Sequence, residues 1–209
     1  MKKILLALWL AGAACLAQAA DLVAPDVLIK NTVRDVLEVV HQDKDIRAGD
    51  QKKILALVDA KVLPHFNFDH MTQLAVGKNW RKATPEQKQA LTTEFRNLLV
   101  RTYTKAFSVY RDQTVEVKPF APLAADATEA TVKSAIIKPG APPVPVDYMM
   151  EKTPNGWKVY DLAVDGVSLV TTYRGSFTDE IGRSGIDGLI KTLVDRNQQL
   201  AANGKADGK

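Results

Sequence analysis

The period of the apolar residues changes twice along this chain, and this change limits the possible folds more than any other feature. From residue 25 to residue 110 apolar side chains recur every three or four positions, as in amphipathic helices. Between residues 115 and 164 they alternate with polar ones, as in half-buried strands, and helical spacing returns from residue 168. Helices, a small antiparallel sheet and further helices together predict a single α+β domain.

Local signals place the ends of the first helices. Apolar spacing predicts helices from Pro25 to His41, over Ile54 to Val62, and from Asp69 to Ala75. A capping box with proline at the first helical position, Thr84-Pro85-Glu86-Gln87, then opens a long amphipathic helix. That helix is expected to run for about 25 residues, or about 38 Å.

The later elements are also marked. About four strands are expected, over residues 115–117, 130–136, 144–150 and 156–164. The pair Asn155-Gly156 is typical of a hairpin turn between the last two strands. Two helical segments follow, Ser168 to Ile181 and one that opens at Ser184, and residues 200–209 are expected to form a frayed, disordered tail.

The N-terminus has the layout of a secretory signal peptide over residues 1–19. Lys2 and Lys3 precede an apolar run that is too short to span a membrane as a helix, and Ala17-Gln18-Ala19 is typical of a cleavage site. Cleavage after Ala19 would leave residues 20–209 as a single exported, soluble domain. Cys15 offers a lipoprotein anchor as an alternative. Gly12 disfavours that anchor, because leucine usually stands three residues before a lipidated cysteine.

Composition excludes several classes of function. With one cysteine and three histidines, the chain has no disulfide framework, and no metal site is expected. No nucleotide-binding loop, dinucleotide-binding glycine pattern or G-x-S-x-G motif occurs, so no cofactor is expected. The formal charge of +4 is too small and dispersed to indicate a nucleic-acid partner.

Few polar residues are candidates for chemistry. Asp147 and Asp161 lie on expected strands and could act as general bases in a cavity, because burial raises a carboxyl pKa. The alternative for each is a structural hydrogen bond or ion pair. His65 and His70 lie five residues apart, which does not place two metal ligands on one helical face.

Two groups of side chains allow more than one interpretation. A basic cluster near the start of the long helix is usually a solvated face, but it could also meet an acidic partner or a lipid headgroup. Its members are Lys78, Arg81, Lys82 and Lys88. An apolar set on the long helix and the strands fits either a packed core or an open cavity. Its members are Tyr103, Phe107, Tyr110, Val146, Tyr148 and Met150.

An ordered set of motifs resembles one known family over nearly the whole chain after the signal peptide. The motifs are Val62-Leu63-Pro64-His65-Phe66, Gly77 with Trp80 to Gln87, Phe95-Arg96-Asn97-Leu98-Leu99, Tyr103, Val146-Asp147-Tyr148, Gly156 to Asp161, Asp165 to Val170 with Tyr173-Arg174 and Phe177, and Gly185 to Ile190. They are similar to those of the MlaC family (the toluene-tolerance auxiliary family), periplasmic phospholipid-binding proteins that maintain outer-membrane lipid asymmetry. Two positions depart from the pattern. Asn67 stands where the family usually has an acid, and Asn79 where an aromatic residue commonly precedes the tryptophan.

The resemblance implies a fold like that of nuclear transport factor 2 (NTF2-like), with a small curved antiparallel sheet covered by helices around a deep apolar pocket. It implies a non-enzymatic carrier in the periplasm of a Gram-negative bacterium, which holds the acyl chains of a diacyl phospholipid in this pocket. The lipid-binding residues implied are Leu74, Val76, Tyr103, Phe107, Ile137, Val146, Tyr148 and Val167. The implied partners are an outer-membrane lipoprotein–porin complex and the substrate-binding subunit of an inner-membrane ABC transporter.

Two other functions fit the same residues. A cavity enzyme of this fold would use Asp161 or Asp147 as a base on a small apolar substrate. An exported interaction module would have a closed core and no ligand.

Overall fold

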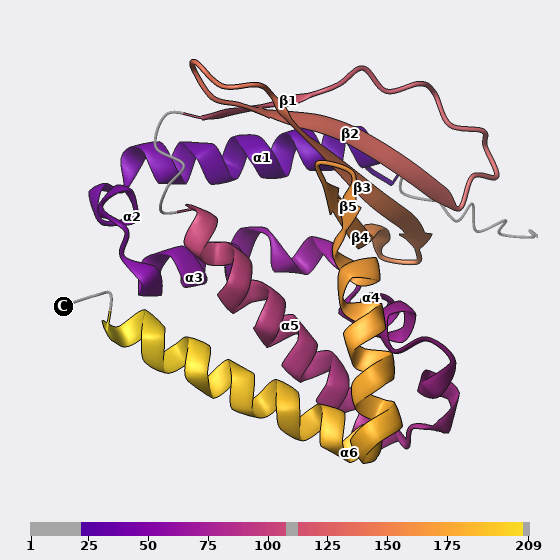
Figure 1. Cartoon of the computed structure of the whole chain (residues 1–209). Helices are drawn as coiled ribbons and strands as arrows, with labels where there is room; N and C mark the ends of the chain where they lie inside the picture. Colours follow the sequence, from indigo (N-terminus) through magenta and orange to yellow (C-terminus); the bar gives the residue numbers. More distant parts are fainter. Residues whose placement is uncertain (1–21, 108–112, 207–209) are drawn as a thin grey trace, which may run out of the picture.

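The computed structural model describes residues 22–107 and 113–206, and Figure 1 shows their arrangement. The helices are α1 (Pro25–Gln42), α2 (Lys44–Ala48), α3 (Gln51–Lys61), α4 (Phe68–Val76), α5 (Pro85–Phe107) and α6 (Leu169–Ala206), with short 3-10 helices η1 (Leu63–His65) and η2 (Gly77–Lys82). The strands are β1 (Thr114–Val117), β2 (Glu129–Ile137), β3 (Val144–Thr153), β4 (Gly156–Val164) and β5 (Val167–Ser168). The predicted order of helices, sheet and helix is confirmed.

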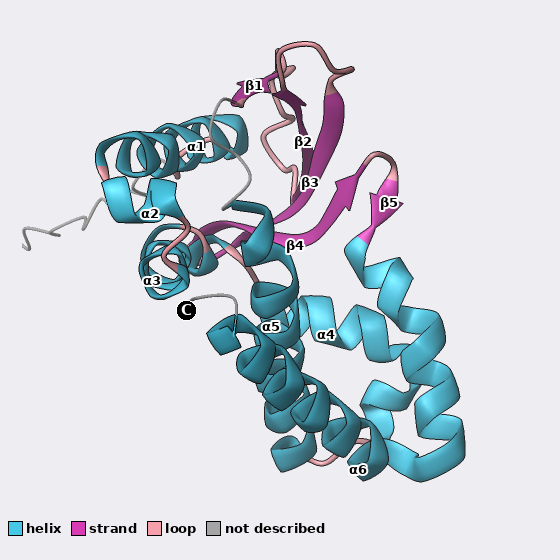
Figure 2. Ribbon diagram, turned by 60° about the vertical axis from the view of Figure 1, so that its left-hand side comes forward, coloured by secondary structure: helices cyan, strands magenta, loops and turns pink. Residues whose placement is uncertain are grey.

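The strands form one antiparallel sheet in sequence order, β1-β2-β3-β4-β5. Figure 2 shows this sheet with α1 along one side and α4, α5 and α6 grouped below it. The hairpin predicted at Asn155-Gly156 is confirmed, since Thr153 pairs with Gly156. The sequence predicts about four strands, and the fifth is β5, whose two residues are too few for alternation to reveal.

A β-bulge in β4 decides which of its residues share a face. Met149 pairs with Asp161 and Met150 pairs with Val159, so Tyr160 is an extra residue in β4. Val159 and Leu162 therefore lie on the same face, although in a regular strand they would lie on opposite faces.

Helix α1 covers part of one face of the sheet, which we call the α1 face. Ile29 of α1 packs there in a buried cluster with Val132, Met150, Trp157 and Val159. A second core lies between α4, α5 and α6. Its buried members are Met71, Ala75, Val76, Leu91, Phe95, Leu98, Leu99, Val170, Phe177, Leu189 and Leu193. Burial of each such side chain contributes roughly 1.5–3 kcal/mol, so both clusters contribute to the stability of the fold.

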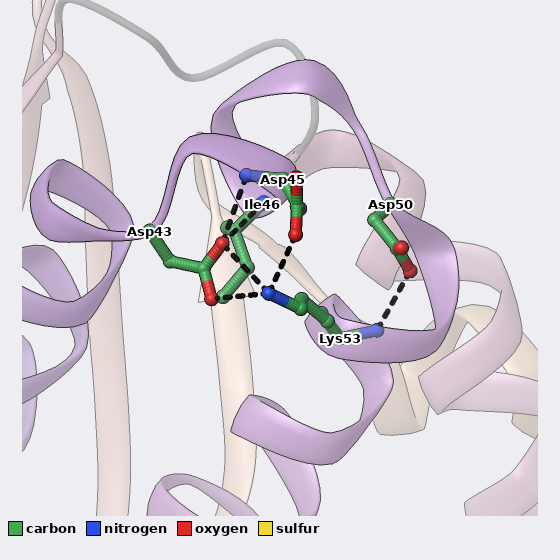
Figure 3. Close-up of polar contacts among 5 residues, drawn as sticks. All are labelled: Asp43, Asp45, Ile46, Asp50 and Lys53. Carbon is green, nitrogen blue, oxygen red and sulfur yellow. Dashed lines mark hydrogen bonds and ion pairs between the residues drawn. The ribbon is translucent and has the colours of Figure 1, made fainter.

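The corner between α1 and α3 is held by a lysine between two carboxylates (Figure 3). The Lys53 ammonium lies 2.9 Å from Asp43 Oδ2 and 2.7 Å from Asp45 Oδ2. Asp43 also caps α2, because its Oδ1 accepts hydrogen bonds from the N–H groups of Asp45 and Ile46 at 2.8 and 3.2 Å. Asp50 caps α3 by accepting from the Lys53 N–H at 3.0 Å.

The start of α6 is anchored to β4 by a short polar network. The Ser168 side chain caps the helix by accepting from the Thr171 N–H at 3.0 Å. Its hydroxyl donates to Asp161 Oδ2 at 2.5 Å, and Asp161 Oδ1 accepts from the Val170 N–H at 3.1 Å. The carboxylate therefore lies at the positive end of the helix dipole, where a negative charge is stabilising.

Helix α6 is long and interrupted once. Its backbone leaves helical geometry at Gly185 (φ 74°, ψ −177°), which separates the two segments that the sequence predicts. The sequence places a frayed tail from residue 200, but the helix instead continues to Ala206, because Leu200 packs against the core of α4, α5 and α6. Asn197 also ties this part of α6 to α5, since its amide donates to the Glu94 carbonyl and side chain at 2.9 and 2.7 Å.

The predicted signal peptide, residues 1–19, lies outside the described residues. Within the described ranges, no helix is both long and apolar enough to cross a membrane. The 23-residue helix α5, for example, carries charged residues along its whole length.

Candidate functional site

A groove of about 680 Å³ lies between α1 and the edge strand β1. It is lined by Lys30, Val33, Arg34, Leu37, Glu38, His41, Gln42, Val115 and Val117. The four apolar side chains are half-buried and the polar ones are exposed, so an apolar interior has a charged rim. The volume lies within the range of roughly 300–1,000 Å³ that is typical of small-ligand sites. This arrangement suits a ligand with an apolar body and a polar end.

The wall formed by β1 continues across the sheet as one row, which we call the apolar row. The pairing register places Val117 opposite Ser134, Ser134 opposite Val146, Val146 opposite Val164, and Val164 opposite Val167. Residues directly opposite one another share a face of an antiparallel sheet, so the row crosses all five strands, or about 19 Å. Val146 is buried, whereas Val167 at the far end is 59% exposed.

Three predicted site residues therefore share the α1 face. Val146 and Val167 belong to the apolar row, and Tyr148 lies in the next row, opposite Val132 and Leu162. Ile137 does not join them. It pairs with Thr114 and lies on the opposite face, whereas its neighbour Ile136 pairs with Val115 and Val144 on the α1 face.

The two residues predicted on α4 lie elsewhere. Val76 is 1% exposed in the core between α4, α5 and α6, and Leu74 packs against that same core. The structure therefore does not bring them together with Val146, Tyr148 and Val167. The resemblance implies that both residues line a pocket, whereas in the structure they lie on the side of α4 that packs against α5 and α6.

Tyr103 lies on α5 at the edge of an aromatic group. It is 38% exposed, and its pKa is raised, first by partial burial and then by the neighbouring Tyr173. Phe95 meets Tyr173 and Phe177 edge-on, with ring centroids 5.1 Å apart in each pair. The predicted Phe107 side chain lies outside the described residues.

One polar pair lies within the α1 face. Ser134 is 2% exposed, and its hydroxyl lies 3.5 Å from the Tyr148 hydroxyl and 3.4 Å from the Val146 carbonyl oxygen. Burial raises the pKa of Tyr148, and the contact with Ser134 only partly opposes this effect. The phenol therefore stays neutral at physiological pH and adds no charge to the apolar face.

The two aspartates considered as catalytic bases have structural surroundings. Both oxygens of Asp161 accept hydrogen bonds from groups at the start of α6, Ser168 and Val170. Asp147 lies opposite Lys133 on the face away from the apolar row. Neither carboxylate lines the groove between α1 and β1.

His65 and His70 are both half-buried outside the groove between α1 and β1. His70 stacks on Tyr160 with ring centroids 4.8 Å apart, and its Nδ1 lies 3.0 Å from Glu151. Burial first and nearby Lys158 second lower the pKa of His65, which favours its neutral form. Among residues 22–107 and 113–206, no group of three or more His, Cys, Asp or Glu side chains is placed to hold a metal ion.

The sequence profile of the MlaC protein family matches residues 30–195, which include most of α1 and every strand of the sheet. The chain belongs to the MlaC family. The resemblance stated from the motifs is thereby confirmed. Among curated MlaC relatives, the toluene tolerance protein ttg2D of Pseudomonas putida is 27% identical over 170 residues, which cover 81% of this chain and 78% of that protein.

Two further relatives extend the comparison. The intermembrane phospholipid transport system binding protein MlaC of Haemophilus influenzae is 22% identical over 182 residues, covering 86% of this chain and 83% of its own. A phospholipid-binding protein from Ralstonia solanacearum, solved in complex with a phospholipid, is 44% identical with a TM-score of 0.79. That match covers 86% of this chain and 99% of the solved one, so the α+β fold predicted from the sequence is confirmed.

Sequence reasoning missed the groove between α1 and β1. Its apolar residues, Val33, Leu37, Val115 and Val117, stand out as periodic positions of a helix and a strand. Nothing in either local pattern indicates that the two elements, about 80 residues apart in the chain, meet side by side. The sequence signal that comes closest to revealing these residues is a helix face that apolar side chains cover only in part.

Proposed function

We propose that this protein is a periplasmic phospholipid carrier that holds acyl chains against the α1 face of its sheet. The groove between α1 and β1 would receive apolar chain, and the apolar row would extend the contact toward Val167. The observation that carries the proposal is this row, which is apolar except for the buried Ser134 and ends in an exposed valine. Similarity to a protein solved with a bound phospholipid supports the same assignment.

The energetics of acyl-chain burial make such a carrier feasible without headgroup chemistry. Each buried methylene contributes about 0.8 kcal/mol, and a diacyl lipid carries roughly 30 of them. The gross sum exceeds any real binding energy, because the membrane that donates the lipid already shields these chains from water. The carrier thus needs an apolar surface that competes with the bilayer, and the headgroup can stay in water.

The proposal extends to the route of the lipid. An exported carrier would exchange phospholipid with an outer-membrane lipoprotein–porin complex and with the substrate-binding subunit of an inner-membrane ABC transporter. The signal-peptide layout of residues 1–19 supports export. The name of the Haemophilus influenzae relative, which describes an intermembrane phospholipid transport system, supports the route. No catalytic step is part of the proposal.

The direct test is to purify the protein from a Gram-negative host without detergent, extract it with organic solvent, and identify the lipids by mass spectrometry. Near-stoichiometric phospholipid is the expected result. Protein that is free of lipid, and that also fails to take up phospholipid from vesicles, would overturn the proposal.

A further inference from the structure

Two hydroxyl groups, those of Ser134 and Tyr148, interrupt the apolar surface around the apolar row. We call them the hydroxyl pair. Ser134 stands in the row between Val146 and Val117, and Val117 lines the groove between α1 and β1. Tyr148 belongs to the next row, but its hydroxyl lies 3.5 Å from Ser134 Oγ. Methylene groups form no hydrogen bonds, so the carriage of acyl chains alone leaves the pair without an assigned role.

The contacts that the hydroxyl pair makes with described residues are long. Ser134 Oγ lies 3.4 Å from the Val146 carbonyl oxygen and 3.5 Å from the Tyr148 hydroxyl, whereas hydrogen bonds between two oxygens usually measure roughly 2.5–3.0 Å. The hydroxyls of Thr72 and Thr104, by comparison, donate to helix carbonyls at 2.7 and 2.6 Å. Ser134 is also shielded from water, at 2% exposure. The pair is therefore able to donate to a better acceptor that comes from outside the protein.

The surroundings of the pair favour a neutral acceptor. Besides the pair, the apolar row and the row next to it contain only aliphatic residues, which are Val117, Val132, Val146, Leu162, Val164 and Val167. A phosphate group held over these two rows would lack a counter-charge there, and burial of an unpaired charge is costly. An ester carbonyl is uncharged and only accepts hydrogen bonds, so it matches two O–H donors. In a diacyl phospholipid this carbonyl lies where the acyl chain begins.

We infer that the hydroxyl pair donates to an ester carbonyl of the bound phospholipid and makes the protein prefer ester-linked over ether-linked lipids. This inference rests on the proposed carrier function. Tyr148 is half-buried on β3, the middle strand, which lies two strands from the groove on one side and two strands from Val167 on the other. A carbonyl held there directs its chain along the row toward the groove. About 10 Å of sheet then separates it from β5, so the headgroup lies toward the exposed Val167.

The test uses vesicles that contain equal amounts of diester and diether phosphatidylethanolamine with identical chains. The purified protein is incubated with the vesicles and re-isolated, and mass spectrometry gives the ratio of the two lipids bound to it. Tyr148→Phe and Ser134→Ala each remove one hydroxyl. Tyr160→Phe is the matched control, because it removes a phenol hydroxyl from the bulge of β4, where the ring stacks on His70 outside both rows. Circular dichroism and thermal melting establish that each variant is folded.

The parent is expected to bind the diester lipid in about three- to tenfold excess over the diether lipid, because one hydrogen bond is gained. Both hydroxyl-pair variants should reduce that excess to less than about twofold, whereas Tyr160→Phe should keep it. All proteins meet the same vesicles, so unequal escape of the two lipids from the bilayer cancels between variants.

Three outcomes would contradict the inference or the function beneath it. A parental ratio in folded Tyr148→Phe would overturn the inference. Equal loss of both lipids in that variant would also overturn it, because the hydroxyl would then act through packing or on the headgroup. A parent that takes up neither lipid would instead overturn the carrier function itself, so the two failures are distinguishable.

Discussion

The hydroxyl of Ser168 and the carboxylate of Asp161 form a 2.5 Å hydrogen bond that joins the last residue of β5 to β4 at the point where α6 begins. The same carboxylate accepts from the Val170 N–H, so one acidic side chain fixes the direction in which α6 leaves the sheet. This relationship gives Asp161 a structural role at the start of α6.

Replacement of Asp161 tests that role. Asp161→Asn is expected to lower the free energy of unfolding by about 1–3 kcal/mol, because a buried charge-assisted acceptor is lost. Asp147→Asn is the matched control and is expected to cost less than about 1 kcal/mol, since Asp147 is half-buried opposite Lys133. Urea denaturation measures both. Equal stability of the two variants would contradict the anchoring role, and folded Asp161→Asn should retain its lipid.

The exposed end of the apolar row is the most direct test of lipid carriage. Val167→Glu is expected to leave stability within about 0.5 kcal/mol of the parent, because the side chain is 59% exposed. It is expected to abolish retention of phospholipid, because a bound acyl chain would bury the new charge without a partner. Tyr103→Glu on α5 tests a residue that the family resemblance implies for the lipid site, and it is likewise expected to abolish retention.

Leu123→Glu is the control for that experiment, since Leu123 is also a large, exposed apolar residue but lies outside the row. Lipid-to-protein ratio by mass spectrometry is the measurement. Loss of lipid in all three variants would point to a general effect of surface charge, and normal retention by Val167→Glu would remove that residue from the site.

The lysine at the α1–α3 corner predicts a pH effect. The Lys53 side chain, followed by the backbone N–H of Ile46, lowers the pKa of Asp43 below its usual value. A carboxyl whose pKa is lower in the folded state stabilises the fold above its unfolded pKa, about 4, and this contribution is lost as pH falls through the folded value. Lys53→Met should therefore lower the urea midpoint at pH 7 and in low salt.

The difference between Lys53→Met and the parent should shrink as the pH falls below about 4, and also in high salt, because the ion pairs are exposed. Lys52→Met is the control, because Lys52 is exposed and makes no ion pair with another described residue. A Lys53→Met deficit that is independent of pH would show that packing, and not charge, accounts for it.

Two glycines should respond in opposite ways to alanine. Gly77 has φ +61° and ψ −134°, and an added Cβ would lie 3.4 Å from the Arg174 guanidinium. Gly77→Ala should destabilise the fold by about 1–3 kcal/mol. Gly175 is helical with open space around it, so Gly175→Ala should stabilise by about 0.5–1 kcal/mol. Thermal melting of the two variants measures the contrast, and melting shifts of the same sign would contradict it.

Local chemistry explains what could be predicted from the sequence. The capping box at Thr84 forms in both directions, with the Thr84 N–H donating to Gln87 Oε1 at 3.0 Å and the Gln87 N–H donating to Thr84 Oγ1 at 3.2 Å. The hairpin at Asn155-Gly156 forms for similar reasons, because Gly156 adopts φ 106°. These features depend on residues a few positions apart, and neighbouring sequence contains all the information needed.

Features that depend on pairing across the sheet could not be predicted in this way. Ile136 and Ile137 are identical side chains, and only the pairing of Ile136 with Val144 decides which of them shares the face of Val146. The bulge at Tyr160 likewise shifts the face of Leu162 through the partner strand. The candidate site is therefore less predictable than the fold, because it depends on register and on the meeting of α1 with β1.

The contact between Asn197 and Glu94 joins segments 103 residues apart. The strands of the sheet, in contrast, each pair with the next one along the chain. A chain that emerges N-terminus first can therefore assemble its sheet early and pack α5 against α4, but the core that these two helices share stays incomplete until α6 follows. For a polypeptide that passes through a translocation channel, this order leaves a large apolar surface exposed until α6 has emerged. A chain in which α6 has not yet emerged would therefore be prone to aggregation.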